Sequence, residues 1–291
     1  MTSTTGSETL SPRTPPKAVK RAAVITHGKP QTIGPALARL TTVAREAGVE
    51  LRLGEEESAK HGLDPENGDS ADVDIAVVLG GDGTMLRALG RYLGVGVPVI
   101  GVNFGRVGFL ASIVRDDLEE GLARVFAGEY RVEELPTLDV EVGNERRVAV
   151  NDLVVASATV GRMIQLEWAV GGEALGRLSC DGVVCSTPPG STGYNFSNGG
   201  PVLVWGLDAM AITFVAPHSL NARPLVVPRG AELIVWNRTP DVAATALVDG
   251  HRVADLTPGA RAVARVGAKR SLLATLPEAT FFSRYRRTFA S

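Results

Sequence analysis

The chain has 291 residues, 44% of them hydrophobic and 21% charged, which excludes a disordered chain and predicts a folded globular protein. Thirty Lys and Arg residues against 32 Asp and Glu leave a net charge of −2, so no basic excess points to a nucleic-acid partner or an anionic membrane. The two cysteines, Cys180 and Cys185, are too few for a disulfide scaffold and lack the spacing of a zinc pair. We expect core thiols in a cytoplasmic protein, since the chain starts without a secretory signal and its longest apolar stretch cannot span a bilayer.

The first half of the chain predicts alternating strands and helices behind a disordered tail, residues 1–17, which is rich in Ser, Thr and Pro. Short apolar runs predict buried strands at 22–26, 49–53, 74–79 and 97–102. Apolar residues at helical spacing predict helices over 33–47 and 85–93. This alternation is typical of a doubly wound parallel sheet, so we assign residues 18–135 to an α/β domain.

From about residue 136 the pattern changes to short β-branched or alternating runs that Gly, Pro and Asn separate. We therefore predict a largely antiparallel, β-sandwich-like domain over residues 136–275. The aromatic and basic stretch 278–289 predicts a helix, within a C-terminal segment, 276–291, that packs back on the first domain. Exposed edges of an apolar β domain favour self-association, as a homodimer or homotetramer.

A glycine-rich segment, GGDGT at 80–84, follows one of the predicted buried strands. Open α/β sheets bind ligands at the carboxyl ends of their strands, and glycines let backbone N–H groups approach a phosphate closely. Asp82 would repel a phosphate, so its carboxylate suits a base acting on a hydroxyl or an outer contact to Mg²⁺. The alternative is a tight structural turn. The candidates for phosphate contacts are Lys29, Gly80, Gly81, Gly83 and Thr84.

Two further motifs carry polar or aromatic groups next to apolar runs. NFGRVGF at 103–109 follows the next predicted strand, and Phe104 could stack on a nucleobase or could belong to the core. Asn151 and Asp152 interrupt an apolar run, where buried polar groups need partners. A ribose diol would supply those partners, and a β-bulge or turn is the alternative.

The densest motif is DGVVCSTPPGSTGYNFSNGGP at 181–201, a strand that runs into a loop of Pro, Gly, Ser and Thr. Hydroxyl and N–H groups of such a loop could bind phosphates or an amide, and Tyr194 offers a flat face. An ordinary polar loop is the alternative. His27 and His251 follow a strand and an Asp-Gly hairpin signal, and each is more often a surface or core histidine than a catalytic one. No His and Cys spacing suits a metal, so the sequence predicts no metal ligands.

These four motifs, in this order, resemble the NAD kinase family. PHSLNARPLVVP at 217–228 and the Asp-Gly pair at 249–250 also fit, so the resemblance runs from about residue 20 to residue 289. It implies an enzyme that transfers the γ-phosphoryl group of ATP to the adenosine 2′-hydroxyl of NAD and makes NADP. It also implies Mg²⁺ or another divalent cation as cofactor, and inorganic polyphosphate would use the same loop as ATP.

The resemblance further implies roles for individual residues. Asp82 matches the general base of the family, Asn151 and Asp152 match the pair that holds a ribose of NAD, and Asp181 matches a carboxylate on the nicotinamide side. The other implied NAD contacts are Gly83, Arg87, Phe104, Arg162, Thr192, Gly193, Tyr194, Asn195, Ser197 and His251. The chain departs from the family where Pro189 and Gly193 replace Thr and Ala, and where Asp152 replaces the Glu of many members.

Two other functions share part of this pattern. A lipid kinase with a GGDG loop would need a membrane-facing surface, for which 278–289 is the candidate segment. The Asn151–Asp152 pair and the loop at 181–201 suit a ribose and an amide better than an acyl chain. A non-catalytic NAD(P) sensor on the same fold would bind without turnover, and the presence of Asp82 argues against it.

Overall fold

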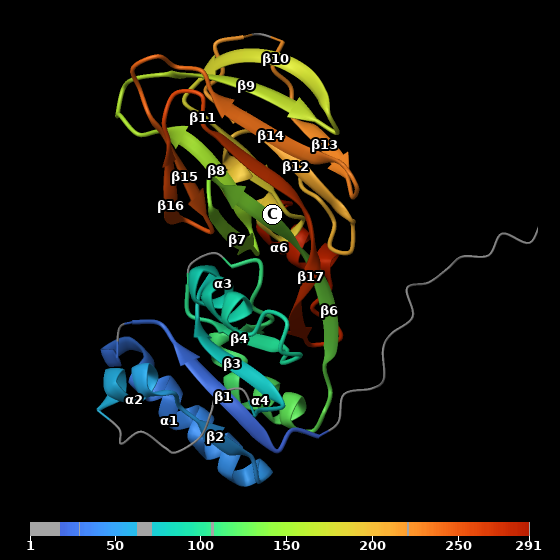
Figure 1. Cartoon of the computed structure of the whole chain (residues 1–291). Coiled ribbons are helices and arrows are strands. Elements are labelled where there is room, and N and C mark those ends of the chain that lie inside the picture. Colours follow the sequence, from blue (N-terminus) through green and yellow to red (C-terminus); the bar gives the residue numbers. More distant parts are fainter. Residues whose placement is uncertain (1–17, 29, 63–71, 106–107, 220, 291) are drawn as a thin grey trace, which may run out of the picture.

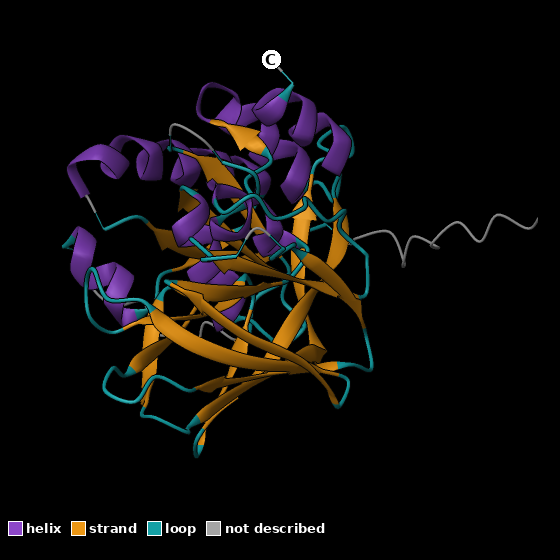
Figure 2. Cartoon of the chain, turned by 90° about the horizontal axis from the view of Figure 1, so that it is seen from above, coloured by secondary structure: helices purple, strands orange, loops and turns teal. Residues whose placement is uncertain are grey.

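The computed structural model describes residues 18–28, 30–62, 72–105, 108–219 and 221–290. The tail predicted over 1–17 and the candidate phosphate contact Lys29 lie outside these ranges. The molecule has a helix-rich α/β part and a part made almost wholly of strands (Figures 1 and 2). In the described part of the chain no helix is long and apolar enough to cross a membrane.

The N-terminal part is built on a parallel sheet in the order β4-β3-β1-β2. Its strands are β1 (Arg21–Thr26), β2 (Glu50–Arg52), β3 (Ile75–Gly80) and β4 (Val99–Asn103), with the short β5 (Ile113–Val114) beside β4. Its helices are α1 (Pro30–Ala47), α2 (Glu55–His61), α3 (Asp82–Arg91) and α4 (Leu118–Phe126), the last preceded by a 3₁₀ turn, η1 (Arg115–Asp117).

Helices cover both faces of this sheet. Side chains of β3 alternate between two cores: Val77 and Leu79 pack with α1 and α4, whereas Ala76 and Val78 pack with α3. Every residue of β3 is buried, as the unbroken apolar run predicts for a strand covered on both sides. The predicted doubly wound α/β arrangement is confirmed.

Helix α3 begins at Asp82, three residues earlier than the apolar spacing predicts. A carboxylate in the first turn of a helix is favoured by the partial positive charge of the helix N-terminus. Gly80 ends β3 directly before this turn, and a Cβ at its position would lie 2.6 Å from the hydroxyl oxygen of Thr84. The turn from strand to helix therefore requires glycine at residue 80.

The C-terminal part is a sandwich of two antiparallel layers around one core. One layer has the order β13-β12-β11-β8-β15-β16, and the other consists of β10-β9-β14-β17 with β6 and β7. The strands are β6 (Arg131–Val142), β7 (Glu145–Ala149), β8 (Asp152–Ser157), β9 (Ile164–Val170), β10 (Glu173–Cys180), β11 (Gly182–Ser186), β12 (Ala209–Val215), β13 (Leu225–Pro228), β14 (Glu232–Asn237), β15 (Ala244–Val248), β16 (His251–Leu256) and β17 (Arg261–Thr275). The predicted β-sandwich-like domain is confirmed.

Both cysteines are core thiols, as predicted, but they lie on different strands. Cys180 ends β10 and Cys185 lies in β11, and both side chains are buried in the sandwich core. Burial raises the pKa of the Cys180 thiol to about 12 and that of Cys185 further, so neither thiol is reactive at neutral pH.

The two parts are joined by long strands and by the C-terminal helix. β6 and β17 pair along most of their length and run from one part into the other (Figure 1). Residue 135, the predicted end of the first domain, lies inside β6. Leu273 of β17 pairs in parallel with Val99 of β4, so one layer of the sandwich continues into the parallel sheet. The helix predicted within 278–289 is α6 (Phe281–Phe289), capped by the side chain of Thr280.

Candidate active site

Asp82 stands in the first turn of α3 with its carboxylate fixed by two backbone donors. The N–H of Phe109 lies 2.8 Å from Oδ2 and the N–H of Leu110 lies 3.1 Å from Oδ1. The two glycine-rich motifs meet here, because the N–H of Phe104 also donates to the carbonyl of Gly80 at 3.0 Å. The folding of β3 and β4 side by side therefore holds a half-buried, oriented carboxylate at the carboxyl edge of the sheet.

Arg87, one turn further along α3, is held at the end of β1. Its Nη2 donates to the carbonyl of Thr26 at 2.9 Å and to Oε1 of Glu57 at 3.1 Å. Glu57 is only 1% exposed and also accepts the N–H and the hydroxyl of Thr26. Sequence analysis missed this buried acid, because the acidic run at 55–57 is typical of a solvated helix face.

Phe104 is partly buried against the core that α1 and α4 cover. The guanidinium carbon of Arg115 lies 5.5 Å from the centre of its ring. The described contacts of Phe104 are thus those of a packing residue. Its neighbours Arg106 and Val107 lie outside the described residues.

Asn151 and Asp152 are held in place by the carboxylate of Asp249. Its Oδ1 accepts the N–H of Asn151 at 2.7 Å and that of Asp152 at 3.2 Å, and its Oδ2 accepts the N–H of Val150 at 2.9 Å. Asp249 and Gly250 form the two-residue turn between β15 and β16, with φ of 49° and 79°. Positive φ at both positions is what the favoured type I′ hairpin turn requires.

The polar side chains at the start of β8 lie in a poorly solvated place. Asp152 is 8% exposed, and burial together with the charge of Asp249 raises its pKa to about 7. Burial also raises the pKa of Asp249, although its three N–H donors oppose that rise. The side-chain carbonyl oxygen of Asn151 is buried without a hydrogen-bond partner. Asp249 was not among the predicted site residues; its signals in the sequence were the Asp-Gly hairpin turn and the fit of this pair to the family pattern.

The loop that follows β11 packs directly on Asn151. It folds into the 3₁₀ turn η2 (Pro189–Thr192) and the short α5 (Tyr194–Ser197). The N–H of Thr187 donates to the carbonyl of Asn151 at 2.8 Å. Gly190 lies against that same carbonyl, and a Cβ at residue 190 would overlap it. The third and fourth motifs therefore form one unit.

The hydroxyl groups of this loop donate to backbone carbonyls of the protein itself. Thr187 donates to the carbonyl of Val150 at 2.6 Å, Ser191 to that of Pro188 at 2.6 Å, and Thr192 to that of Pro189 at 3.2 Å. The Asn195 side chain is fully buried and bridges three internal groups, two carbonyls and the hydroxyl of Thr213. The exposed candidates on the loop are Gly193, Tyr194 and Ser197.

Three further candidates lie in the β-sandwich part of the chain. Asp181 is exposed between β10 and β11, and exposed Arg162 pairs with Asp241 at 3.0 Å in the connection from β8 to β9. Both lie near the end of β8 that is opposite Asp152. The six residues of this strand span about 17 Å. His251 is exposed directly after the Asp249 turn.

Arg284 of α6 connects this site to the end of the chain. Its side chain is 1% exposed, and burial lowers its pKa to about 10, so it remains a cation at neutral pH. Its guanidinium carbon lies 5.2 Å from the ring centre of Trp205. The Phe109 ring packs edge-on against Trp205 at 5.6 Å. The sequence did not single out Arg284, since one arginine among several gives no signal of burial.

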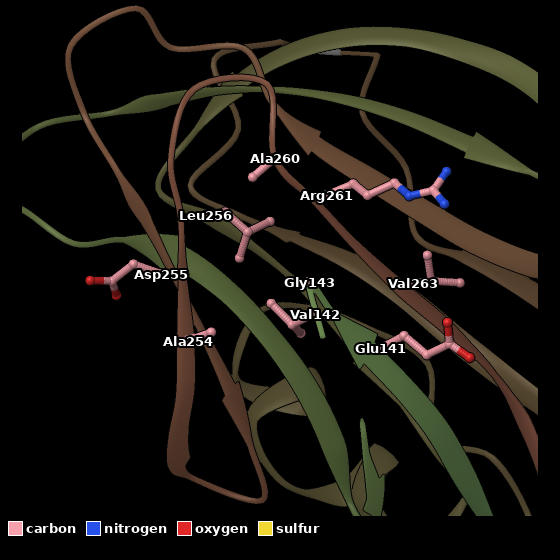
Figure 3. Close-up of a pocket in the computed structure, with 9 residues that line it drawn as sticks. All are labelled: Glu141, Val142, Gly143, Ala254, Asp255, Leu256, Ala260, Arg261 and Val263. Carbon is pink, nitrogen blue, oxygen red and sulfur yellow. The ribbon is translucent and has the colours of Figure 1, made fainter. Parts of the chain in front are cut away.

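A depression of about 230 Å³ opens elsewhere, between β6, β16 and β17 (Figure 3). Its centre is apolar around Leu256, and the side chains of Asp255 and Arg261 point away from one another. The Asp255 carboxylate is paired with Arg252 at 2.6 Å, and Glu141 with Arg265 at 2.8 Å. None of the candidate site residues that the structure describes lines it. Over the described ranges, no group of three or more His, Cys, Asp or Glu side chains could hold a metal ion.

The chain has a GGDG turn at the edge of a parallel α/β sheet, and this turn faces loops of a β-sandwich. This combination is that of the two-domain kinases with a GGDG turn. Sequence families agree: residues 43–130 match the ATP-NAD kinase N-terminal domain, and residues 150–275 match the ATP-NAD kinase C-terminal domain. The chain belongs to the NAD kinase family.

Individual relatives support this assignment. The NAD kinase of Heliobacterium modesticaldum is 39% identical over 215 residues, which is 72% of this chain and 76% of the relative. The NAD kinase of Leifsonia xyli is 41% identical over 225 residues, or 75% and 74% of the two chains. An Archaeoglobus fulgidus NAD kinase solved in complex with ATP has a TM-score of 0.72 at 26% identity, covering 91% of this chain and 98% of that one. Yeast NADH kinase complexed with NADH has the same fold, with a TM-score of 0.80 at 19% identity over 94% and 88% of the two chains.

Proposed function

We propose that this protein transfers the γ-phosphoryl group of ATP to the adenosine 2′-hydroxyl of NAD, with Asp82 as the general base. The observation that carries this proposal is the oriented carboxylate of Asp82, held by the N–H groups of Phe109 and Leu110 at the sheet edge. A ribose hydroxyl is a poor nucleophile at neutral pH, so a carboxylate within hydrogen-bond reach of it accelerates attack.

The bonds that form and break in this reaction leave one proton for Asp82 to accept. The 2′-oxygen forms a bond to the γ-phosphorus, and the bond from that phosphorus to the bridging oxygen of ADP breaks. The hydroxyl proton passes to the Asp82 carboxylate. The backbone N–H groups of Gly81 and Gly83, at the start of α3, would hold phosphate oxygens. Gly80 is buried at the end of β3, and the N–H of Thr84 donates to the carbonyl of Gly81 at 3.0 Å, so these two serve the turn itself.

Asn151 and Asp152 would bind a ribose of NAD. A buried polar atom is normally hydrogen-bonded, and the side-chain oxygen of Asn151 has no partner. A ribose hydroxyl donating to it would satisfy this oxygen. The Asp152 carboxylate beside it accepts hydroxyl protons when ionised, and its pKa of about 7 lets it titrate under physiological conditions.

A divalent cation would enter with the phosphates of ATP. Mg²⁺ is usually held by one or two carboxylates together with substrate phosphates, and it neutralises charge on the transferring group. The Asp82 carboxylate fits a contribution to such a site, because each of its oxygens accepts one backbone N–H in the described part of the chain and has further lone pairs for a cation. The rest of the ligand set would be phosphate and water.

Asp181 and Arg162 would serve the site of a second copy of the chain. Within one chain they lie at the far end of β8 from Asp152, too far to contact the same ribose. A homodimer or homotetramer that brings this end of the sandwich to another chain's site would account for both the NAD contacts and the predicted assembly.

The geometry of α6 argues against a lipid kinase. Phe281 is buried, and its ring packs on Phe109 at 5.4 Å and on Trp205 at 5.7 Å. Phe281, one aromatic residue of the stretch proposed to face a membrane, thus joins the two parts of the molecule, whereas Phe282 is 68% exposed.

The test is an NADP-forming assay with ATP, Mg²⁺ and NAD, run on the wild type, Asp82→Asn and the exposed control Asp116→Asn. We expect Asp82→Asn to lower kcat by about 10²-fold or more, the size of a general-base contribution, and the control to match the wild type. Wild-type protein inactive with ATP and with polyphosphate would overturn the kinase assignment. A thermal shift by NAD and NADP without turnover would establish the sensor instead, and full activity of Asp82→Asn would remove the proposed base.

A further inference from the structure

A buried guanidinium lies behind the loop that binds the Asp82 carboxylate. Nη1 of Arg284 donates to three successive carbonyls, those of Phe109 at 2.9 Å, Leu110 at 2.9 Å and Ala111 at 2.7 Å. Its Nε donates to the carbonyl of Ala279 within the turn before α6, at 3.0 Å. The phosphoryl-transfer steps above make no use of this residue.

The segment that contains Phe109 and Leu110 contacts both the Asp82 carboxylate and the Arg284 guanidinium. The N–H groups of Phe109 and Leu110 point at Asp82, and the carbonyls of Phe109 and Leu110 point at Arg284. The peptide unit between Phe109 and Leu110 therefore lies between an anion and a cation, because its N–H points at Asp82 and its carbonyl at Arg284. Hydrogen bonds in such a chain polarise one another, so a cation at the carbonyl end strengthens the N–H donor at the other end.

Packing alone does not account for an arginine here. Burying a guanidinium is costly, and an apolar side chain of similar volume fills such a place without that cost. Trp205 lies over the guanidinium, but an apolar side chain at residue 284 would leave the carbonyls of Phe109, Leu110 and Ala111 without this donor. What the arginine adds is a set of donors for three carbonyls of one segment.

We infer that Arg284 is a positioning residue for phosphoryl transfer: it holds segment 109–111 so that the N–H groups of Phe109 and Leu110 fix the Asp82 carboxylate toward the attacking hydroxyl. This inference rests on the proposed function of Asp82. It makes α6 part of the active-site structure, although α6 itself contacts no reacting atom.

The aromatic contacts of α6 extend this support to the loop after β11. The ring of Phe289, at the end of α6, lies 4.7 Å from that of Phe196 on α5 and 6.1 Å from that of Phe109. One helix thus contacts the segment that orients Asp82 and the loop that carries Tyr194.

The experiment compares Arg284→Lys and Arg284→Met with Arg286→Met, an exposed arginine on the same helix. Each is made in the wild-type and the Asp82→Asn background. We expect Arg284→Met to lower kcat by about 10- to 100-fold, the cost of misplacing a catalytic group, with KM for NAD and ATP changed less than about 3-fold. Arg284→Lys should recover part of the loss, because it keeps the charge but not the planar fork. In the Asp82→Asn background the Arg284 variants should have little further effect.

Hydrogen exchange of the peptide that covers residues 108–112 provides a readout independent of turnover. We expect faster exchange in both Arg284 variants and wild-type exchange in Arg286→Met. If Arg284→Met does not fold, Arg284→Lys decides by the same two readouts. Wild-type kcat and exchange in Arg284→Lys would overturn the inference, and so would an equal loss of kcat with and without Asp82. If the wild type makes no NADP, the proposed function fails, and exchange alone then tests whether Arg284 holds the segment.

Discussion

Asp249 and Asp152 exchange a reciprocal pair of backbone and side-chain contacts. The N–H of Asp249 donates to the carbonyl of Asp152 at 3.0 Å, and the carboxylate of Asp249 accepts the N–H of Asp152 at 3.2 Å. This relationship ties the turn between β15 and β16 to the first residue of β8. It also places two carboxyl groups close together in a poorly solvated site, which has measurable consequences.

The first consequence is a pH-dependent stability. The pKa of Asp152 is about 7 in the folded state against 3.8 without the fold, so folding favours its protonated form. As far as Asp152 contributes, the free energy of unfolding is therefore highest below about pH 4, and it falls as the pH rises toward the folded-state pKa of about 7. Asp152→Asn should remove this dependence and raise Tm by about 3–6 °C at pH 8.5, with little change at pH 4. Thermal melts at both pH values check this, and an equal shift at both would contradict it.

The second prediction concerns Asp249 as the anchor of Asn151 and Asp152. Asp249→Ala should leave three backbone N–H groups without an acceptor and lower the free energy of unfolding by about 3 kcal/mol or more. It should also raise KM for NAD by more than it lowers kcat, since the ribose contacts are displaced.

Asp249→Asn is the matched control for that experiment. Asparagine tolerates the positive φ of this turn and keeps one acceptor oxygen, so its losses should be smaller than those of Asp249→Ala. Equal melting temperatures of Asp249→Ala and the wild type would show that the three hydrogen bonds contribute nothing.

A third prediction follows from the contact between Gly190 and the carbonyl of Asn151. Gly190→Ala places a Cβ on that carbonyl, so the loop and the start of β8 must separate. We expect a lower Tm and weaker NAD binding, measured by calorimetric titration. Gly34→Ala is the control, because a Cβ there meets nothing within 4 Å in α1 and alanine favours helix. Unchanged NAD affinity in Gly190→Ala would detach this loop from the nucleotide site.

A fourth prediction tests the buried acid beside Arg87. Glu57→Gln weakens charge-assisted hydrogen bonds from Arg87 and Lys60, and it should lower the free energy of unfolding by about 1.5–3 kcal/mol. Glu56→Gln, an exposed neighbour that contacts the same two cations, should change it by less than about 1 kcal/mol. Urea unfolding of both variants measures the difference, and equal midpoints would refute the special weight of the buried carboxylate.

Local patterns were enough to predict most elements of the first half. The run at 74–79 predicts a strand within one residue of β3, because a strand buried on both faces must be apolar throughout. The start of α3 was placed too late, since three glycines and an aspartate are typical of a turn when their helical hydrogen bonds are unknown. The four motifs also placed the chain in its family correctly, because each depends on residue types at short spacing.

The amino-acid order alone thus settles the class of fold, the family and the chemical groups available for the reaction. Their assembly depends on contacts between residues far apart in the chain. Asp249 binds backbone groups 97 to 99 residues away, and Arg284 binds carbonyls 173 to 175 residues away. Such contacts leave no local periodicity, because they depend on which strands become neighbours and not on the pattern within any one of them. Only the tertiary structure therefore shows that a hairpin turn anchors Asn151 and Asp152 and that the last helix contacts the segment that binds the Asp82 carboxylate.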